Sequence, residues 1–300
     1  MARTVEKLAG GGTYFEGARW HEGRWWVSDI FESTVRTYDT GGRGEDVMRV
    51  EHHPSGLGWL PDGSLLVVSM QDRLLLRRDP DGSVSVHADL SSSCKTDLND
   101  MVVDEKGRAF VGTIGFAIAE GEQPRTGPVF RVDPDGTVTV AAEDLWCPNG
   151  MVIGTDERTL VIGESFASRL TAFTISDDGS LTDRRVHAQV GEAPAPGSTE
   201  DMFAAAALVP DGAAADAEDH VWVADPLRQR CVRISPEGGI VDEVVSPHGQ
   251  DIFACALGGE DGRTLLLCAA PDFFAAAQGG NRGEGVLLTT RVDVPHGGRP

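Results

Sequence analysis

Six short phrases recur along the chain, and four of them begin with a side chain that could bind a metal ion. The leading residues are Glu16, Ser55, Asn99, Asn149, Asp211 and Phe253. Two carboxylates and two carboxamides offer only oxygen ligands, which suit Ca²⁺, Mg²⁺ or Mn²⁺; an oxygen-rich site with open positions can also hold Zn²⁺ or Fe²⁺. Such a metal polarises an ester carbonyl and lowers the pKa of bound water, so the predicted chemistry is hydrolysis.

The same residue types also have a plain structural explanation. Asn149 and Asp211 are each followed by glycine, and Asn-Gly and Asp-Gly are common turn dipeptides. A turn explains each residue taken alone. A metal site explains why Glu16, Asn149 and Asp211 all lead equivalent phrases, so we predict that these three residues bind one divalent ion, with Ca²⁺ preferred over Zn²⁺, Mn²⁺, Mg²⁺ or Fe²⁺.

A repeated β structure must position these phrases. Their leading residues lie 39, 44, 50, 62 and 42 residues apart, close to the period of roughly 40–50 residues of a four-stranded propeller blade. Short β-rich runs follow each phrase, and turns such as Asp133-Pro-Asp-Gly136 separate them, which indicates antiparallel hairpins. We therefore predict an all-β fold, a six-bladed β-propeller of four-stranded antiparallel blades, with residues 1–300 forming a single domain.

No helical period competes with this interpretation. The run Ala204 to Ala207 predicts at most one short helix. In a propeller the first strand of every blade lines the central channel, so the six leading residues should form a ring at one end of it.

Composition limits the classes of partner. The formal net charge of −21 argues against a nucleic acid or an anionic membrane as partner, since either requires a basic surface. The N-terminal residues lack the apolar stretch of a signal peptide, so we expect a cytoplasmic protein. The five cysteines are scattered, without a CxxC pair, and we expect reduced thiols. The expected partner is a small-molecule substrate. We expect the protein to be a monomer or a weak homo-oligomer.

Several phrases around the leading residues form a wider pattern. They are Phe15-Glu-Gly17, Leu98-Asn-Asp100, Pro148-Asn-Gly150, Glu164-Ser-Phe166 and Pro210-Asp-Gly212. In these phrases the chain resembles the SMP-30/gluconolactonase/LRE (regucalcin-like) family over nearly its whole length. The resemblance implies a six-bladed propeller with one divalent metal held by Glu16, Asn149 and Asp211. It also implies that Asn99 contacts the metal or the substrate, in a gluconolactonase-like hydrolase of carboxylic esters.

One position departs from the family pattern. Sugar lactonases that resemble regucalcin carry an arginine two residues before Asn99, where it helps to bind a polyhydroxylated substrate, and this chain has Asp97. Asp97 could still accept hydrogen bonds from hydroxyls, but the sugar lactone loses its main polar anchor. Asp211 is the candidate general base because it would touch both metal and water, and Asp100 is expected to point away from the axis.

The expected mouth of the channel carries apolar side chains. Phe116 lies in a loop between second and third strands, and Phe253 lies in the ring itself; both indicate a partly hydrophobic substrate, with ordinary loop packing as the alternative. Glu164 could receive a substrate hydroxyl or make a structural hydrogen bond. The longest interval contains residues 191–203, an insertion that forms either a lid or a plain surface loop.

Three functions are compatible with these residues. The first is a metal-dependent hydrolase that opens a lactone. The second is a non-catalytic propeller that binds a metal or another ligand, and the third is an isomerase or condensing enzyme on the same metal site.

Overall fold

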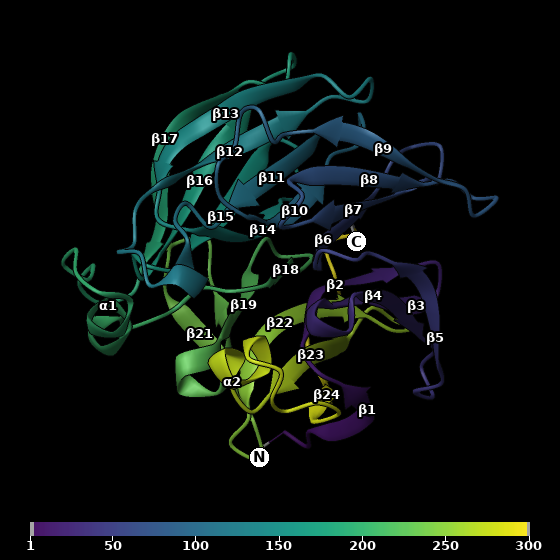
Figure 1. The fold of residues 1–300 in the computed structure, drawn as a ribbon. Helices are drawn as coiled ribbons and strands as arrows, with labels where there is room; N and C mark the ends of the chain where they lie inside the picture. The colour runs from purple at the N-terminus through teal and green to yellow at the C-terminus, as the bar shows by residue number, and fades with distance from the viewer. Residues whose placement is uncertain (1–2, 299–300) are drawn as a thin grey trace.

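The computed structural model describes residues 3–298, which form six four-stranded antiparallel sheets (Figure 1). The first strand of each sheet contacts the first strand of the next, and the sixth contacts the first. These contacts close a ring, so the predicted six-bladed β-propeller is confirmed.

Each blade runs outward from the central channel in chain order. Blade 1 consists of β2 (Phe15–His21), β3 (Arg24–Asp29), β4 (Thr34–Tyr38) and β5 (Gly44–Arg49). Blade 2 consists of β6 (Pro54–Trp59), β7 (Leu65–Ser69), β8 (Leu74–Arg78) and β9 (Val84–Asp89). Blade 3 consists of β10 (Leu98–Val103), β11 (Ala109–Thr113), β12 (Gly127–Val132) and β13 (Val138–Leu145).

The remaining blades follow the same order until the last. Blade 4 consists of β14 (Pro148–Ile153), β15 (Thr159–Glu164), β16 (Arg169–Ile175) and β17 (Leu181–Gln189). Blade 5 consists of β18 (Ala213–Ala215), β19 (Val221–Asp225), β20 (Arg230–Ile234) and β21 (Ile240–Val245). Blade 6 consists of β22 (Asp251–Gly258), β23 (Thr264–Ala270), β24 (Gly285–Arg291) and β1 (Glu6–Gly12).

Strand β1 completes the last blade from the other end of the chain. It pairs with β24 in antiparallel register, from Glu6 opposite Thr289 to Gly12 opposite Gly285 (Figure 1). The sequence does not predict this strand, because three of its seven residues are glycine and none is β-branched. Strand β1 thus forms the outer strand of blade 6 and ties the start of the chain to its last sheet.

Short helices lie in the connections between strands. They are η1 (Ile30–Glu32), η2 (Ile118–Glu120), α1 (Thr199–Ala205), η3 (Pro226–Arg228) and α2 (Phe273–Ala277). Helix α1 begins earlier than the predicted alanine run, because the Ser198 side chain accepts a hydrogen bond from the Asp201 N–H and caps it. It ends at Ala205, since Ala206 is extended.

The core lies between the blades, where apolar residues of neighbouring sheets face one another. One cluster joins Leu66, Met101 and Phe130 of blades 2 and 3, and another joins Phe110, Met151 and Ile162 of blades 3 and 4. All five cysteines are buried free thiols, as expected. No helix within residues 3–298 is long and apolar enough to cross a membrane.

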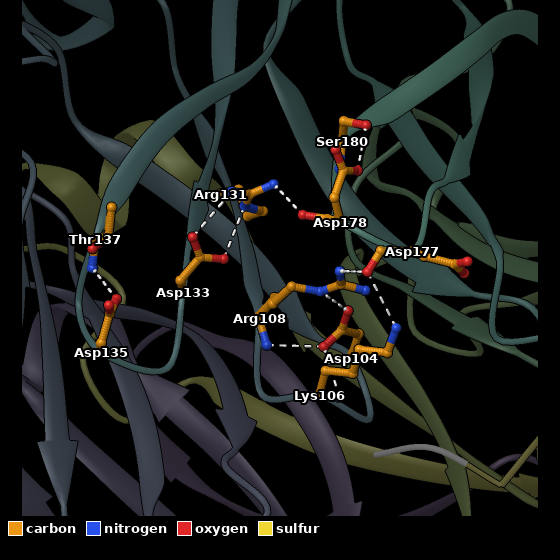
Figure 2. Close-up of polar contacts among 10 residues, drawn as sticks. All are labelled: Asp104, Lys106, Arg108, Arg131, Asp133, Asp135, Thr137, Asp177, Asp178 and Ser180. Atoms are coloured by element: carbon orange, nitrogen blue, oxygen red, sulfur yellow. Dashed lines mark hydrogen bonds and ion pairs between the residues drawn. The ribbon is translucent and has the colours of Figure 1, made fainter.

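Charged side chains join blades at the end of the channel opposite the leading residues. In Figure 2, Arg108 bonds Asp104 of its own turn at 2.6 Å and reaches the carbonyl of Asp177 in the next blade at 3.2 Å. Arg131 reaches the carbonyl of Asp178 at 2.9 Å. These contacts fix blade 3 against the β16–β17 turn of blade 4.

Candidate active site

The leading residues lie where the first strands begin, and irregular pairing marks these positions. The strand register shifts between Glu16 and Arg19 in blade 1, between Leu98 and Met101 in blade 3, and between Pro148 and Met151 in blade 4. A bulge inserts an extra residue and redirects the side chain beside it. The irregularity therefore belongs to the repeated phrase and positions Glu16, Asn99 and Asn149.

Glycine follows several leading residues because the next blade lies against it. A Cβ atom on Gly17 would lie 2.4 Å from the carbonyl oxygen of Ser55, and one on Gly150 would lie 2.2 Å from that of Asp211. Only glycine permits this close backbone approach. The first strands consequently meet at the axis, which brings the leading side chains together.

Glu16 and Asp211 are buried carboxylates that influence each other's ionisation. Their side chains belong to residues that are 7% and 9% exposed. Burial raises the pKa of Asp211 to about 8, and the Asn149 side chain opposes part of this shift. Burial, followed by the charge of Asp211, raises the pKa of Glu16 well above its usual value. The two carboxylates thus lie in a region of low dielectric constant, where no cationic side chain in the described part of the chain pairs with either of them.

The two asparagines are held with their amide nitrogens occupied. Asn99 Nδ2 donates to the carbonyl of Pro148 at 3.3 Å, and Asn149 Nδ2 donates to Ser165 Oγ at 3.3 Å. Ser165 Oγ in turn donates to the carbonyl of Pro210 at 2.7 Å. Within residues 3–298 neither amide oxygen accepts a hydrogen bond, so both oxygens are available as ligands.

A buried ion pair lies beneath the ring. Arg19 Nη2 bonds Asp100 Oδ1 at 2.9 Å and the Met101 carbonyl at 2.5 Å, and Arg19 Nη1 bonds the Ala18 carbonyl at 2.8 Å. The negative charge of Asp100 raises the pKa values of both Glu16 and Asp211. Asp100 therefore lies beside the ring, contrary to the expectation that it points away from the axis.

The donor set fits a divalent cation. Residues 3–298 contain no group of three or more His, Cys, Asp or Glu side chains arranged to hold a metal, but the ring offers a different set of ligands. It combines two carboxylates that lack a counter-ion with amide oxygens whose nitrogens are fixed elsewhere, and hard cations are bound by such oxygens. A divalent ion between Glu16, Asn149 and Asp211 would supply the missing positive charge.

Asp97 and Phe253 lie near the same end of the channel. Asp97 is partly buried, and burial raises its pKa, an effect that His53 and Arg73 oppose. The ring of His53 meets Phe31 edge-on, with centroids 5.4 Å apart. Phe253 lies against Tyr14 at 4.5 Å, and its carbonyl accepts a hydrogen bond from the N–H of Gly212.

Glu164 and Phe116 are fully engaged in packing. The Glu164 carboxylate accepts hydrogen bonds from the Trp146 N–H, from Arg169 and from Thr171. Phe116 is buried and meets Phe166 edge-on at 5.3 Å. Glu164 therefore makes structural hydrogen bonds and Phe116 packs within a loop cluster. Neither side chain presents a free surface to a substrate.

The insertion covers this aromatic cluster. Met202 of helix α1 is buried in it, and Phe203 stacks on Phe166 with ring centroids 4.6 Å apart. The segment before the helix is largely exposed. Helix α1 is thus anchored to blade 4, at the end of the channel where the leading residues lie.

Three residues of the site were missed in the sequence. Tyr14 has a signal only in its spacing, because it stands two residues before Glu16 and directly precedes β2. Arg19 has no such signal, since the bulge after Glu16 breaks the alternation. Ser165 was noticed only as part of a phrase, and its role depends on a contact with Pro210 in the next blade.

Several known proteins are similar to this chain. Residues 15–271 match the family described as the SMP-30/Gluconolactonase/LRE-like region. The chain is 27% identical over 258 residues to a pentonolactonase of Haloferax volcanii, covering 85% of this chain and 81% of that protein. It is 29% identical over 207 residues to the 6-deoxy-6-sulfogluconolactonase of Pseudomonas putida, covering 68% and 64%.

A solved structure has the same fold. The calcium-binding protein regucalcin of Agrobacterium tumefaciens superposes with a TM-score of 0.79 at 22% identity, covering 100% of this chain and 97% of that one. At this level of identity the likeness bears on the fold alone.

Proposed function

The chain belongs to the SMP-30/gluconolactonase/LRE-like family, and we propose that it is a metal-dependent hydrolase that opens a lactone ring. Glu16, Asn149 and Asp211 bind the metal in this proposal, and Asn99 contacts the metal or the substrate. Relatives named as lactonases support the reaction class.

One observation carries the proposal. Glu16 and Asp211 are buried together, each with a raised pKa, and neither forms an ion pair with a described residue. Burying two unpaired carboxylates is costly. Such an arrangement is retained where a cation completes it, and calcium is the cation that suits carboxylate and amide oxygens.

A bound divalent ion would polarise the lactone carbonyl and acidify water. Asp211 accepts the proton from the attacking water, whose oxygen forms a bond to the acyl carbon. The bond between that carbon and the ring oxygen breaks, the ring oxygen takes up a proton, and a hydroxy acid results. Asn149 would help to hold the metal, and Asn99 would contact the metal or the substrate, without adding charge.

The walls favour a substrate with an apolar part. Tyr14, Phe31, Phe253 and Phe273 lie together beside the ring, with centroid separations from 4.5 to 6.1 Å. The position that carries a sugar-binding arginine in related enzymes is Asp97. An aliphatic or aryl substituent would bury apolar surface here, whereas a polyhydroxylated chain would lose hydrogen bonds to water.

The test is turnover across a panel of aliphatic, aromatic and sugar lactones, with and without a chelator. We expect hydrolysis of the apolar lactones, loss of turnover on chelation, and recovery when Ca²⁺ is restored. Mass spectrometry should show products heavier by one water. Products of unchanged mass would indicate an isomerase, and tight ligand binding without turnover would indicate a binding protein; either result contradicts the proposal.

A further inference from the structure

We propose that the hydroxyl of Tyr14 contacts the substrate, donating a hydrogen bond to the acyl oxygen of a bound lactone or of its ring-opened hydroxy acid. This inference rests on the proposed function and adds to it a residue outside the predicted metal and substrate set.

The backbone fixes Tyr14 at the ring end of blade 1. Its N–H donates to the buried carboxylate of Asp29 at 3.1 Å, and its carbonyl accepts from the N–H of Ile30 at 3.0 Å. Asp29 is itself held by Arg36 at 3.2 Å. Tyr14 is thus placed by a buried network and not by a loop that can move freely.

The side chain points toward the carboxylates of the ring. Tyr14 directly precedes strand β2 and stands two residues before Glu16, a spacing at which the side chains of an extended chain lie on one side. The intervening Phe15 faces the opposite way, into the core beside Tyr38, at 6.0 Å. The Tyr14 ring also lies against Phe253, the leading residue of blade 6, with centroids 4.5 Å apart, which places the phenol beside the leading residues.

The hydroxyl of Tyr14 lacks a partner. Tyr14 is 4% exposed, yet its hydroxyl makes no hydrogen bond to any residue from 3 to 298. It is also absent from the enclosed polar atoms that lack a partner in that range, so it retains contact with solvent. A buried tyrosine hydroxyl normally finds a partner, and a ligand in the channel would provide one.

The aromatic ring of Tyr14 belongs to the apolar wall. It contacts Phe253 at 4.5 Å, Phe31 at 5.5 Å and Phe273 at 5.5 Å, so blades 1 and 6 both restrain it. The residue therefore joins the two parts of the site. Its ring faces the apolar portion of a substrate, while its hydroxyl reaches toward the polar portion at the carboxylates.

A phenol suits this position because it donates a hydrogen bond without adding a charge. The acyl oxygen gains negative charge as water attacks the lactone, and a fixed donor stabilises that charge. The same oxygen belongs to the carboxylate of the product. Tyr14 should therefore strengthen the binding of a hydroxy acid as well as accelerate hydrolysis.

The first experiment compares Tyr14→Phe with the wild type in binding 4-hydroxydecanoate, the ring-opened form of an apolar lactone, to Ca²⁺-loaded protein. Losing one hydrogen bond of this kind should weaken binding about tenfold. The Ca²⁺ affinity should not change, and the melting temperature should stay within about 2 °C, because no protein hydrogen bond is lost. Equal affinity of the two proteins, or no binding by the wild type, would overturn the inference.

Tyr38→Phe is the matched control, since Tyr38 is the second of only two tyrosines. It is also buried, but it packs on Phe15 away from the ring, so its replacement should leave hydroxy-acid binding unchanged. A loss equal to that of Tyr14→Phe would show that any buried phenol matters and would contradict a direct contact.

Fluorine NMR tests the contact between Tyr14 and the hydroxy acid independently of lactone hydrolysis. Labelling with 3-fluorotyrosine gives one ¹⁹F resonance for each tyrosine, and Tyr38→Phe identifies them. Adding 4-hydroxydecanoate to Ca²⁺-loaded protein should shift the Tyr14 resonance and leave that of Tyr38 in place; an unmoved Tyr14 resonance refutes the contact. A protein that binds the hydroxy acid through Tyr14 but hydrolyses no lactone would refute the proposed reaction alone.

Discussion

Neutralising Asp211 should stabilise the metal-free protein, although it removes a charged side chain from one of the six repeated phrases. The pKa of Asp211 is raised from 3.8 to about 8, and each unit corresponds to about 1.4 kcal/mol. The ionised carboxylate therefore costs at most about 6 kcal/mol of folding free energy. Because water in the channel end solvates part of the charge, we expect Asp211→Asn to gain about 2 kcal/mol.

The direction of the pKa shift determines how the stabilisation by Asp211→Asn depends on pH. A carboxyl group with a raised folded-state pKa holds its proton more tightly in the folded protein, so its stabilising contribution is complete below pH 4. That contribution is lost as the pH rises to about 8. The gain from Asp211→Asn should accordingly be small near pH 4 and largest near pH 8 and above.

The assay is chemical denaturation in a chelator at pH 5, 7 and 8.5, with Glu164→Gln as the control. Glu164 is more deeply buried than Asp211, but it is satisfied by Arg169, Thr171 and a backbone N–H. Its neutralisation should cost roughly 2 kcal/mol, because it removes charge-assisted hydrogen bonds. If Asp211→Asn is as destabilising as Glu164→Gln at pH 8.5, Asp211 has a counter-charge within the protein and our reasoning fails.

Two further predictions concern the backbone around the ring. Gly150→Ala should destabilise the protein by at least about 2 kcal/mol in chemical denaturation and weaken Ca²⁺ binding in calorimetry, because its Cβ would meet the Asp211 carbonyl at 2.2 Å. Gly239→Ala, whose Cβ would have no contact closer than 3.9 Å, is the control, and equal effects would contradict the explanation. Deleting Pro194–Gly197, which leaves the Ser198 cap intact, should change the preference among lactones in kinetic assays but shift the melting temperature little. An unchanged substrate profile would show that this segment is a plain surface loop.

The period of the repeated phrase was sufficient to predict the propeller and the strands that carry the ring. Glycine and turn residues punctuate each blade, so the strand order follows from local signals. Strand β1 was not predictable in this way, since Glu6–Gly12 has little β character and is held only by β24, far away in the chain. The start of helix α1 had a local signal in Ser198 and Asp201, which the alanine run obscured.

The leading residues of the site were visible in the sequence, whereas their supports were not. Tyr14 stands two residues before Glu16 and just ahead of β2, whereas the bulge after Glu16 turns Arg19 toward Asp100. Such a turn depends on how two strands pair and has no fixed sequence pattern. Contacts between blades, such as Ser165 with Pro210, depend on the closed ring and cannot be read from one blade.

Calorimetric titration of the metal-stripped protein with Ca²⁺ tests the central claim most directly, because it asks whether Glu16, Asn149 and Asp211 bind a cation. We predict one Ca²⁺ per chain in the wild type and loss of that binding in Glu16→Gln, with the fold of the variant intact by circular dichroism. Failure of the wild type to bind any of Ca²⁺, Mg²⁺, Mn²⁺ or Zn²⁺, or unaltered binding by Glu16→Gln, would contradict the claim.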